Sequence, residues 1–294
     1  MNERFAGRGP TLFTDFDEYA LYMLRDLDVG GPNFEHPPPA LARVSNYRYP
    51  VALTSVPPVR LLPYALIVTR RDPAASRPPS AYRLLWQGTY YEVWGRTPGA
   101  PAAIAAIALS GPPAQQCPDI RRAARLARAE GAHLVAASSP QLLPISLARA
   151  SHPAHWGSPR KGIAIGSPGR LSAVFNAPTA AGAELWLQGD IMPALRVSMD
   201  ERPVASIGAQ LGGNSVVRNT LTPVPVSLSV GPHRISLSRT SSILAPGDGG
   251  SAIVYAMFLT PSRGAGQDPL RVVAPSRWRS LCGRSYDWIE VVRS

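Results

Sequence analysis

Short runs in which apolar and polar residues alternate dominate the second half of the chain. The alternation is clearest over 195–199 and returns over 226–230 and 235–238. Because successive side chains of a strand point to opposite faces, each run predicts a half-buried β-strand. Turn signals such as Asp200-Glu201-Arg202-Pro203 separate the runs. We therefore expect strands over 170–176, 183–188, 194–199, 204–211, 224–230, 233–238 and 252–259, which together form an antiparallel β-sandwich or jelly roll.

The first half mixes helical and extended patterns. Residues 11–28 begin with a short apolar run and continue with apolar residues at helical spacing, which predicts a helix capped by Asp15. Further apolar runs predict a buried strand over 64–69, a hairpin over 81–85 and 89–94, and a basic helix from 118 that leads into a strand over 133–137. These elements predict a small α/β unit ahead of the sandwich.

This order of elements places the chain in the α+β class, with a small α/β unit followed by an antiparallel β-sandwich (jelly roll). A length of 294 residues suits about two domains. We expect the first unit over 1–150, with proline-rich excursions, and the sandwich over 151–268. The C-terminal tail, 269–294, is expected to return to the first unit.

The chain is strongly basic. It carries a formal net charge of +11, from 30 Lys and Arg against 19 Asp and Glu, and Lys161 is the single lysine. The one dense cluster, Arg121, Arg122, Arg125 and Arg128, lies on the expected basic helix. A nucleic-acid site would join such a cluster to aromatic stacking residues, which this segment lacks. We expect a solvated helix face and no nucleic-acid partner; attraction to an anionic polymer or lipid surface is the alternative.

The apolar stretches are too short to form a transmembrane helix. The most apolar of them, 101–109, is far shorter than the roughly 20 residues that span a bilayer. The first ten residues also lack the apolar core of a signal peptide. We expect a soluble chain that carries no export signal of its own.

Cys117 and Cys282 are the only two cysteines, and no C-x-x-C spacing occurs. Two cysteines cannot form a structural zinc site without histidine ligands, and no acidic loop is dense enough for calcium, so we expect no metal and no cofactor. A disulfide between Cys117 and Cys282 would staple the tail to the start of the basic helix and indicate an oxidising compartment. We expect this disulfide, with two unrelated buried thiols as the alternative.

Three stretches of the second half share a pattern: GAELWLQGD at 182–190, LRVSMDERPV at 195–204 and VSLSVGPHRISLSR at 226–239. A strand leads into the hairpin turn Met199-Asp200-Glu201-Arg202, and a later strand ends in the Gly-x-His turn Gly231-Pro232-His233. This region resembles carbohydrate-binding modules of the galactose-binding-like jelly-roll class. The resemblance implies a jelly roll that binds sugars, and it is specific for the fold rather than for one ligand.

Two stretches of the first half, GRGPTLFTDFDEYALYMLRDLD at 7–28 and the segment 61–96, carry a second pattern. They are similar to extracytoplasmic C-terminal regions of large actinobacterial polytopic membrane proteins that look like lipid-linked-sugar glycosyltransferases. In that superfamily the catalytic acid lies near the first membrane helices, which this chain lacks. The resemblance therefore implies no catalytic residue here.

Polar residues near the expected strand ends of the sandwich are the candidate ligand-binding residues. They are Asp190, Asn214, Arg239 and Asp248, with Trp186 as the side chain that stacks on a sugar ring. Asp248 belongs to GDGGS at 247–251, which resembles the nucleophile region of trypsin-like proteases but lacks the histidine and aspartate contexts of that class. We expect a glycine loop at the rim of the sandwich instead.

We favour a non-catalytic binding module located outside the cytoplasm, in the cell envelope. Its expected ligand is a cell-envelope polysaccharide or lipid-linked sugar, and its expected role is accessory to a membrane glycosyltransferase, with a membrane protein as a further partner. One alternative is a carbohydrate-active enzyme that uses a carboxylate pair drawn from Glu184, Asp190, Asp200 and Glu201. The other is a purely structural module.

Overall fold

The computed structural model describes residues 2–15, 22–31, 51–101, 103–157, 162–191, 193–207, 220–240, 250–261 and 270–293. The chain divides into two compact units. The first unit comprises Met1–Pro140 and Gly266–Ser294, and the second comprises Gln141–Ala265. From the sequence we expect these divisions after residues 150 and 268. In the described part of the chain, no helix has the length and apolar character needed to cross a bilayer.

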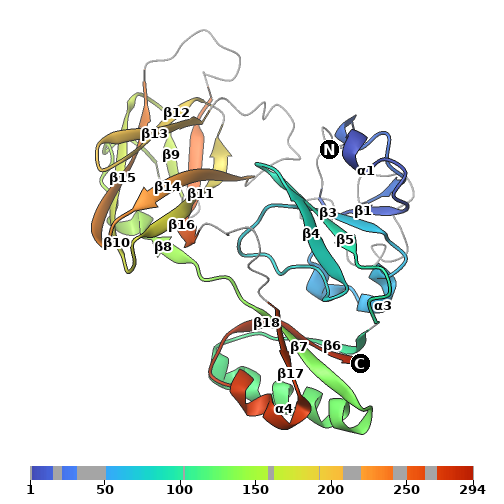
Figure 1. Cartoon of the computed structure of the whole chain (residues 1–294). Coiled ribbons are helices and arrows are strands. Elements are labelled where there is room, and N and C mark those ends of the chain that lie inside the picture. The colour runs from blue at the N-terminus through green and yellow to red at the C-terminus, as the bar shows by residue number, and fades with distance from the viewer. Residues whose placement is uncertain are drawn as a thin grey trace. The chain divides into compact units, whose positions relative to one another are not determined.

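The first unit contains a mixed five-stranded sheet (Figure 1). Its strands are β1 Thr11–Phe13, β2 Val29–Gly30, β3 Leu66–Arg70, β4 Tyr82–Gln87 and β5 Tyr91–Arg96, flanked by the short helices α1 Asn2–Phe5, η1 Leu53–Ser55 and α3 Pro58–Leu61. The strand order is β2-β1-β3-β5-β4, with β1 parallel to β2 and β3 and the other pairs antiparallel. The expected buried strand and hairpin are therefore confirmed.

The segment after β1 was expected to form a helix capped by Asp15, and residues 16–21 of that helix lie outside the described residues. Asp15 itself is 5% exposed, and its carboxylate accepts a hydrogen bond from the Arg70 guanidinium at 3.1 Å. Because Asp15 follows β1 and Arg70 ends the parallel strand β3, the two charges meet at one edge of the sheet.

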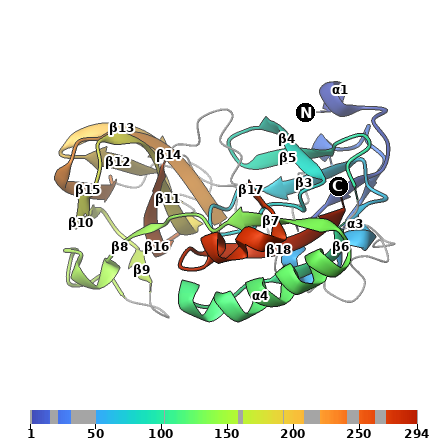
Figure 2. The same cartoon turned by 60° about the horizontal axis from the view of Figure 1, so that its bottom comes forward.

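The second sheet of the first unit is antiparallel and combines distant parts of the chain. It consists of β6 Ala103–Ala108, β7 Ala132–Ser138, β17 Leu270–Val273 and β18 Tyr286–Arg293, in the order β17-β7-β18-β6. Helix α4, Pro113–Ala129, and the 3₁₀ helix η4, Pro275–Leu281, pack on one face (Figure 2). The alanine-rich side of α4, centred on Ala123 and Ala127, allows close approach to the sheet.

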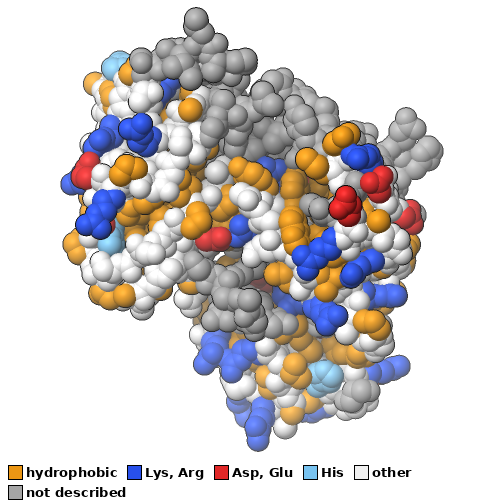
Figure 3. Space-filling model, turned by 45° about the horizontal axis from the view of Figure 1, so that its top comes forward, with side chains coloured by type: hydrophobic (Ala, Val, Ile, Leu, Met, Phe, Trp, Pro, Cys, Tyr) orange, Lys and Arg blue, Asp and Glu red, His pale blue; other side chains and the backbone are white. Residues whose placement is uncertain are grey.

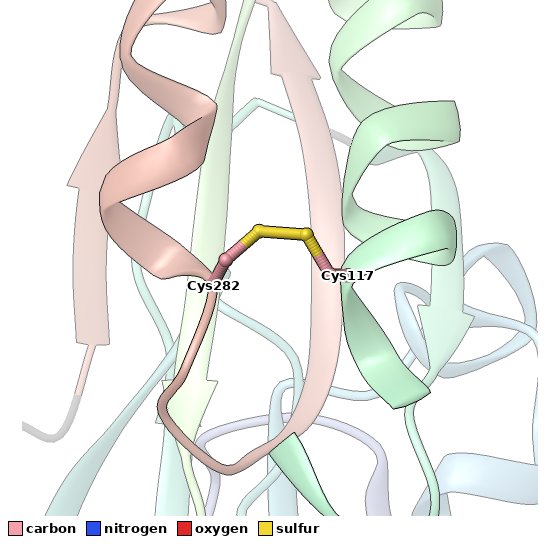
Figure 4. Close-up of a disulfide and its surroundings, with 2 residues drawn as sticks. All are labelled: Cys117 and Cys282. Atoms are coloured by element: carbon pink, nitrogen blue, oxygen red, sulfur yellow. A yellow bond between two sulfur atoms is a disulfide. The ribbon is translucent and has the colours of Figure 1, made fainter. Parts of the chain in front are cut away.

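The disulfide between Cys117 and Cys282 is confirmed (Figure 4). The two Cα atoms lie 5.2 Å apart and are separated by 165 residues in sequence. It links the start of α4 to the residue that follows η4. The C-terminal tail joins a sheet of the first unit, in which β18 lies between β6 and β7.

The second unit is an antiparallel β-sandwich. One sheet has the order β10-β15-β12-β13, and the other has the order β14-β11-β16-β8 with β9 beside β16. The strands are β8 Leu143–Ile145, β9 Ile163–Ile165, β10 Gly169–Ala177, β11 Ala181–Ile191, β12 Leu195–Met199, β13 Arg202–Ile207, β14 Thr220–Leu228, β15 Gly231–Arg239 and β16 Ala252–Pro261, with the 3₁₀ helix η2 Leu147–Arg149 after β8. The α+β class with an antiparallel sandwich is confirmed.

The core of the sandwich is built from the inward-facing residues of both sheets. Leu171, Leu185, Val197 and Leu237 are each at most 1% exposed and belong to one apolar cluster. They occupy alternate positions of β10, β11, β12 and β15, as the period of two in the sequence predicts. Between β12 and β13, Asp200 and Glu201 adopt positive φ angles of 50° and 65°, the geometry of a tight hairpin turn.

Candidate functional site

Two of the predicted ligand-binding residues, Trp186 and Asp190, lie on the same face of β11. The odd-numbered residues Leu185, Leu187 and Ile191 belong to the sandwich core. Strand alternation therefore turns the even-numbered residues to the outer face of this sheet. On that face β11 presents Glu184, Trp186, Gln188 and Asp190 in succession.

A β-bulge in β16 adds a tyrosine to this outer face. The register of β11 with β16 shifts between Gln188, which pairs with Ala256, and Gly189, which pairs with Val254, so Tyr255 is the extra residue. Gly189 permits the close approach of the two strands, because a Cβ atom there would lie 2.1 Å from the carbonyl oxygen of Ile253. The bulge thus brings the Tyr255 hydroxyl to the Asp190 carboxylate, to which it donates a hydrogen bond at 2.9 Å.

We call the side chains of Glu184, Gln188, Asp190 and Tyr255 the β11 polar face. All four are partly exposed. They provide carboxylate and amide acceptors, amide donors and one aromatic ring within two adjacent strands. Such a set can hydrogen-bond a polyhydroxylated ligand and pack against its apolar C–H groups.

Trp186, the residue expected to stack on a sugar ring, is buried. It is 2% exposed, and its ring packs in a cluster with Leu221 and Phe258. Its indole N–H donates to the Thr260 hydroxyl at 3.0 Å. Trp186 pairs with Phe258 of the neighbouring strand β16, and the two aromatic rings pack beside the β11 polar face.

Arg239, another predicted site residue, does not join this face. Arg239 ends β15 in the opposite sheet, is 6% exposed, and donates hydrogen bonds to the carbonyl oxygens of Ile165 at 3.0 Å and Gly250 at 2.9 Å. These contacts give Arg239 a structural role in joining three segments of the sandwich. Asn214 and Asp248 lie outside the described residues.

The described carboxylates do not supply a glycosidase pair on this face. Glu184 and Asp190 are six residues apart on one strand, which corresponds to about 20 Å at a rise of ~3.3 Å per residue. Retaining and inverting glycosidases hold their carboxyl groups only ~5–10 Å apart. Glu201 forms an ion pair with Arg170 at 2.7 Å, and Asp200 binds a histidine, as described next.

The hairpin turn at 199–202 and the turn at 231–233 meet through His233, which was not a predicted site residue. His233 Nδ1 lies 2.6 Å from Asp200 Oδ2, and the backbone N–H of Arg234 donates to Asp200 Oδ1 at 2.8 Å. On its other side, His233 Nε2 lies 2.9 Å from the carbonyl oxygen of Ser229 and 3.4 Å from its hydroxyl. The His233 ring stacks on Phe175 with ring centroids 5.6 Å apart.

Serine, histidine and aspartate resemble a hydrolytic triad in composition, but the hydrogen bonds indicate another role. The Ser229 carbonyl and the Asp200 carboxylate both accept from the ring, and together they raise the pKa of His233 above its ordinary value. Burial alone would raise the pKa of Asp200, but the Arg234 N–H and His233 lower it overall. The Ser229 carbonyl oxygen, 2.9 Å from Nε2, can only accept, so Nε2 carries a hydrogen and offers no lone pair to activate the Ser229 hydroxyl. The pair instead clamps two hairpin turns.

A pocket of about 380 Å³ lies in the first unit, between the β6–β18 edge and the segment that contains η1 and α3. Its lining is mainly apolar, with Val56, Pro58, Ala106 and Trp288 among the contributing residues. Glu290, which is 1% exposed, also lines it. The pattern of the sequence does not indicate this site, because β6 and β18 are far apart along the chain.

Burial raises the pKa of the Glu290 carboxyl, while the hydrogen bonds from Ser80 and the charge of Arg77 act in the opposite direction. The Ser80 N–H donates to Glu290 Oε2 at 3.0 Å. The Trp288 indole donates to the Arg77 carbonyl at 3.2 Å, and the Arg77 guanidinium lies over Trp94 at 5.2 Å. These contacts hold the loop at Arg77–Ser80 against β18. In the described part of the chain, no group of three acidic, histidine or cysteine side chains could hold a metal ion.

No family model and no curated protein matches the chain. Among solved structures, it is similar to the CBM36-1 domain of a multidomain xylanase from the hindgut metagenome of Trinervitermes trinervoides, with 16% identity and a TM-score of 0.31 over 42% of this chain and 100% of that one. It is also similar to a family 35 carbohydrate binding module from Clostridium thermocellum, with 14% identity and a TM-score of 0.30 over 42% and 100%. A CBM35 from Paenibacillus barcinonensis gives 9% identity and a TM-score of 0.30 over 42% and 99%. All three TM-scores lie below 0.5.

Proposed function

We propose that the second unit binds a carbohydrate through the β11 polar face. The observation that carries this proposal is the bulge at Tyr255, which brings a phenol beside the Asp190 carboxylate on a face already occupied by Gln188. Bulges of this kind re-aim side chains next to binding sites. A sugar hydroxyl can take the place of water on such acceptors, while the phenol ring covers an apolar patch of the sugar.

The proposed ligand is a cell-envelope polysaccharide or a lipid-linked sugar, bound outside the cytoplasm. The disulfide between Cys117 and Cys282 supports an oxidising compartment. The resemblance of residues 7–28 and 61–96 to extracytoplasmic regions of membrane glycosyltransferases supports an accessory role beside such an enzyme. The module itself carries no catalytic step in this proposal.

The test is a binding measurement with the whole purified chain. Actinobacterial wall polysaccharides are screened first, at low and high salt, and the strongest ligand is then titrated into three variants. We expect Gln188→Ala and Tyr255→Phe each to weaken binding about fivefold, the equivalent of one hydrogen bond of ~1 kcal/mol. Arg196→Ala, an exposed change on β12 of the opposite sheet, is the control and should bind like the wild type.

Saturable binding that survives high salt and weakens only in the two face variants supports the proposal. Binding that disappears with salt reflects the net charge of +11 and contradicts it. Release of new reducing ends from the bound polysaccharide would show that the chain hydrolyses it. The second unit would then be a hydrolase rather than a binding module.

A further inference from the structure

Helix α4 and the 3₁₀ helix η4 lie side by side on one face of the β17-β7-β18-β6 sheet (Figures 2 and 4). The Arg128 guanidinium, near the end of α4, donates to the carbonyl oxygen of Pro275, at the start of η4, at 3.2 Å. The disulfide joins Cys117, near the start of α4, to Cys282, just after η4. The two helices therefore run antiparallel and are fixed to each other at both ends.

Six arginines cover the outer side of this pair of helices. Ile120, Ala123, Ala124 and Ala127 of α4 are buried against the sheet. Residues at i, i+4 and i+7 share one side of a helix, so the arginines at 121, 125 and 128 form one stripe along α4, and all three are exposed. We call the following exposed residues the arginine face: Arg121, Arg122, Arg125, Arg128, Arg277 and Arg279.

The positive charge of the arginine face is only slightly compensated. Asp119 is the one acidic residue within the two helices, so the six arginines leave them a net charge of +5. Asp119 pairs with Arg122 at 2.9 Å. Within the described residues, no carboxylate lies within 4.0 Å of the other five guanidinium groups. Figure 3 shows one side of the molecule, on which Lys and Arg side chains lie among hydrophobic and other residues.

We propose that the arginine face docks the first unit on the surface of an anionic phospholipid membrane. Guanidinium groups bind phosphate through paired hydrogen bonds, and clustered basic residues add favourably at an anionic lipid surface. The two helices are fixed on one sheet, so the cations form a single rigid layer that suits a plane of headgroups. Trp278 is the only aromatic residue of the two helices. It is half-buried, and the Arg279 guanidinium lies 5.3 Å from the centroid of its ring. A single half-buried ring disfavours base stacking with a nucleic acid.

The test measures sedimentation of the whole chain with vesicles of phosphatidylcholine, with and without phosphatidylglycerol. The face variant is Arg121→Gln, Arg125→Gln and Arg279→Gln. The control is Arg60→Gln, Arg83→Gln and Arg196→Gln, which removes the same charge from exposed positions elsewhere. We expect the face variant to lose on the order of a hundredfold in partitioning to the anionic vesicles, because each of the three cations contributes about fivefold.

Three results together support the proposal. The face variant loses binding to anionic vesicles, the control variant binds them like the wild type, and neutral vesicles leave the wild type in solution. Equal losses in the two triple variants would overturn it, since the net charge rather than the arginine face would then control binding. Soluble polyglutamate serves as a second probe. If it binds the wild type as tightly as the anionic vesicles do and loses as much in the face variant, the surface recognises polyanions in general and the membrane proposal fails.

Discussion

At the scale of single residues, the contact between His233 and Asp200 makes the stability of the second unit depend on pH. The pKa of His233 is raised in the folded chain, so its contribution is complete below the unfolded pKa of about 6.5 and declines as the pH rises through the folded value. The pKa of Asp200 is lowered, so its contribution is present above about pH 4 and declines as the pH falls further. The pair is therefore strongest between about pH 4 and 6.5.

We expect the free energy of unfolding of the second unit to fall as the pH rises from about 6 to 9, and this slope to disappear in His233→Gln. Urea unfolding at a series of pH values measures it. Ser229→Ala serves as the control, because the Ser229 carbonyl, which the substitution retains, is the closer partner of the ring. A slope that persists in His233→Gln would show that other groups produce it.

Glu290 gives the first unit the same sign of pH dependence that His233 gives the second, because both pKa values are raised in the folded chain. Its pKa is raised by burial, so ionisation above the unfolded value of about 4.3 costs free energy in the folded state. Glu290→Gln should therefore equal or exceed the wild type in stability at neutral pH, since an amide oxygen can still accept from Ser80. Glu290→Ala leaves the Ser80 N–H without this acceptor and should lose about 1–3 kcal/mol in denaturant unfolding. Equal losses in both variants would contradict this assignment.

At the scale of elements, the bulge between β11 and β16 depends on the absence of a side chain at Gly189. An alanine Cβ there would lie 2.1 Å from the Ile253 carbonyl oxygen, and the two strands would have to separate. We expect Gly189→Ala to destabilise the second unit by about 1–3 kcal/mol, measured by urea unfolding. Gly157→Ala is the matched control, because a Cβ at Gly157 meets nothing within 4 Å. Comparable stability of the two variants would rule out the close approach at Gly189.

The disulfide holds the arrangement of α4, η4 and β18 against the entropy of a long loop. The loop between Cys117 and Cys282 spans 165 residues, for which the chain-entropy account gives about 5 kcal/mol. The double variant Cys117→Ser and Cys282→Ser should therefore shift the unfolding of the first unit to lower denaturant. The second unit should unfold as before, as followed by hydrogen exchange. A shift confined to the second unit would contradict this account.

At the scale of the whole molecule, the sequence predicts those elements whose signal is local. The alternation of Leu195, Val197 and Met199 identifies β12, and the turn at Asp200 identifies the hairpin that follows. The pair of cysteines indicates how the tail returns. Strand β6 was not predicted, because its alanines show little alternation and its partner β18 begins at Tyr286, far along the chain.

The site was predictable only in part, for the same physical reason. Alternation along β11 places Trp186 and Asp190 on one face, but it cannot reveal that Leu221 and Phe258 cover the indole. Tyr255 reaches Asp190 through a bulge whose position depends on the partner strand. Asp200 and His233 were both within quoted motifs, yet their contact requires β12 and β15 to be neighbours, which is a property of the sheet order.

The most direct test of the account is hydrogen–deuterium exchange of the whole chain with and without the wall polysaccharide that binds it best. If the β11 polar face is the carbohydrate site, the ligand should slow amide exchange in the peptides that cover 184–190 and 253–260. Peptides from β10, in the opposite sheet, should exchange at unchanged rates. Protection confined to β10 and its sheet, or to the first unit, would contradict the central claim that the β11 polar face binds carbohydrate.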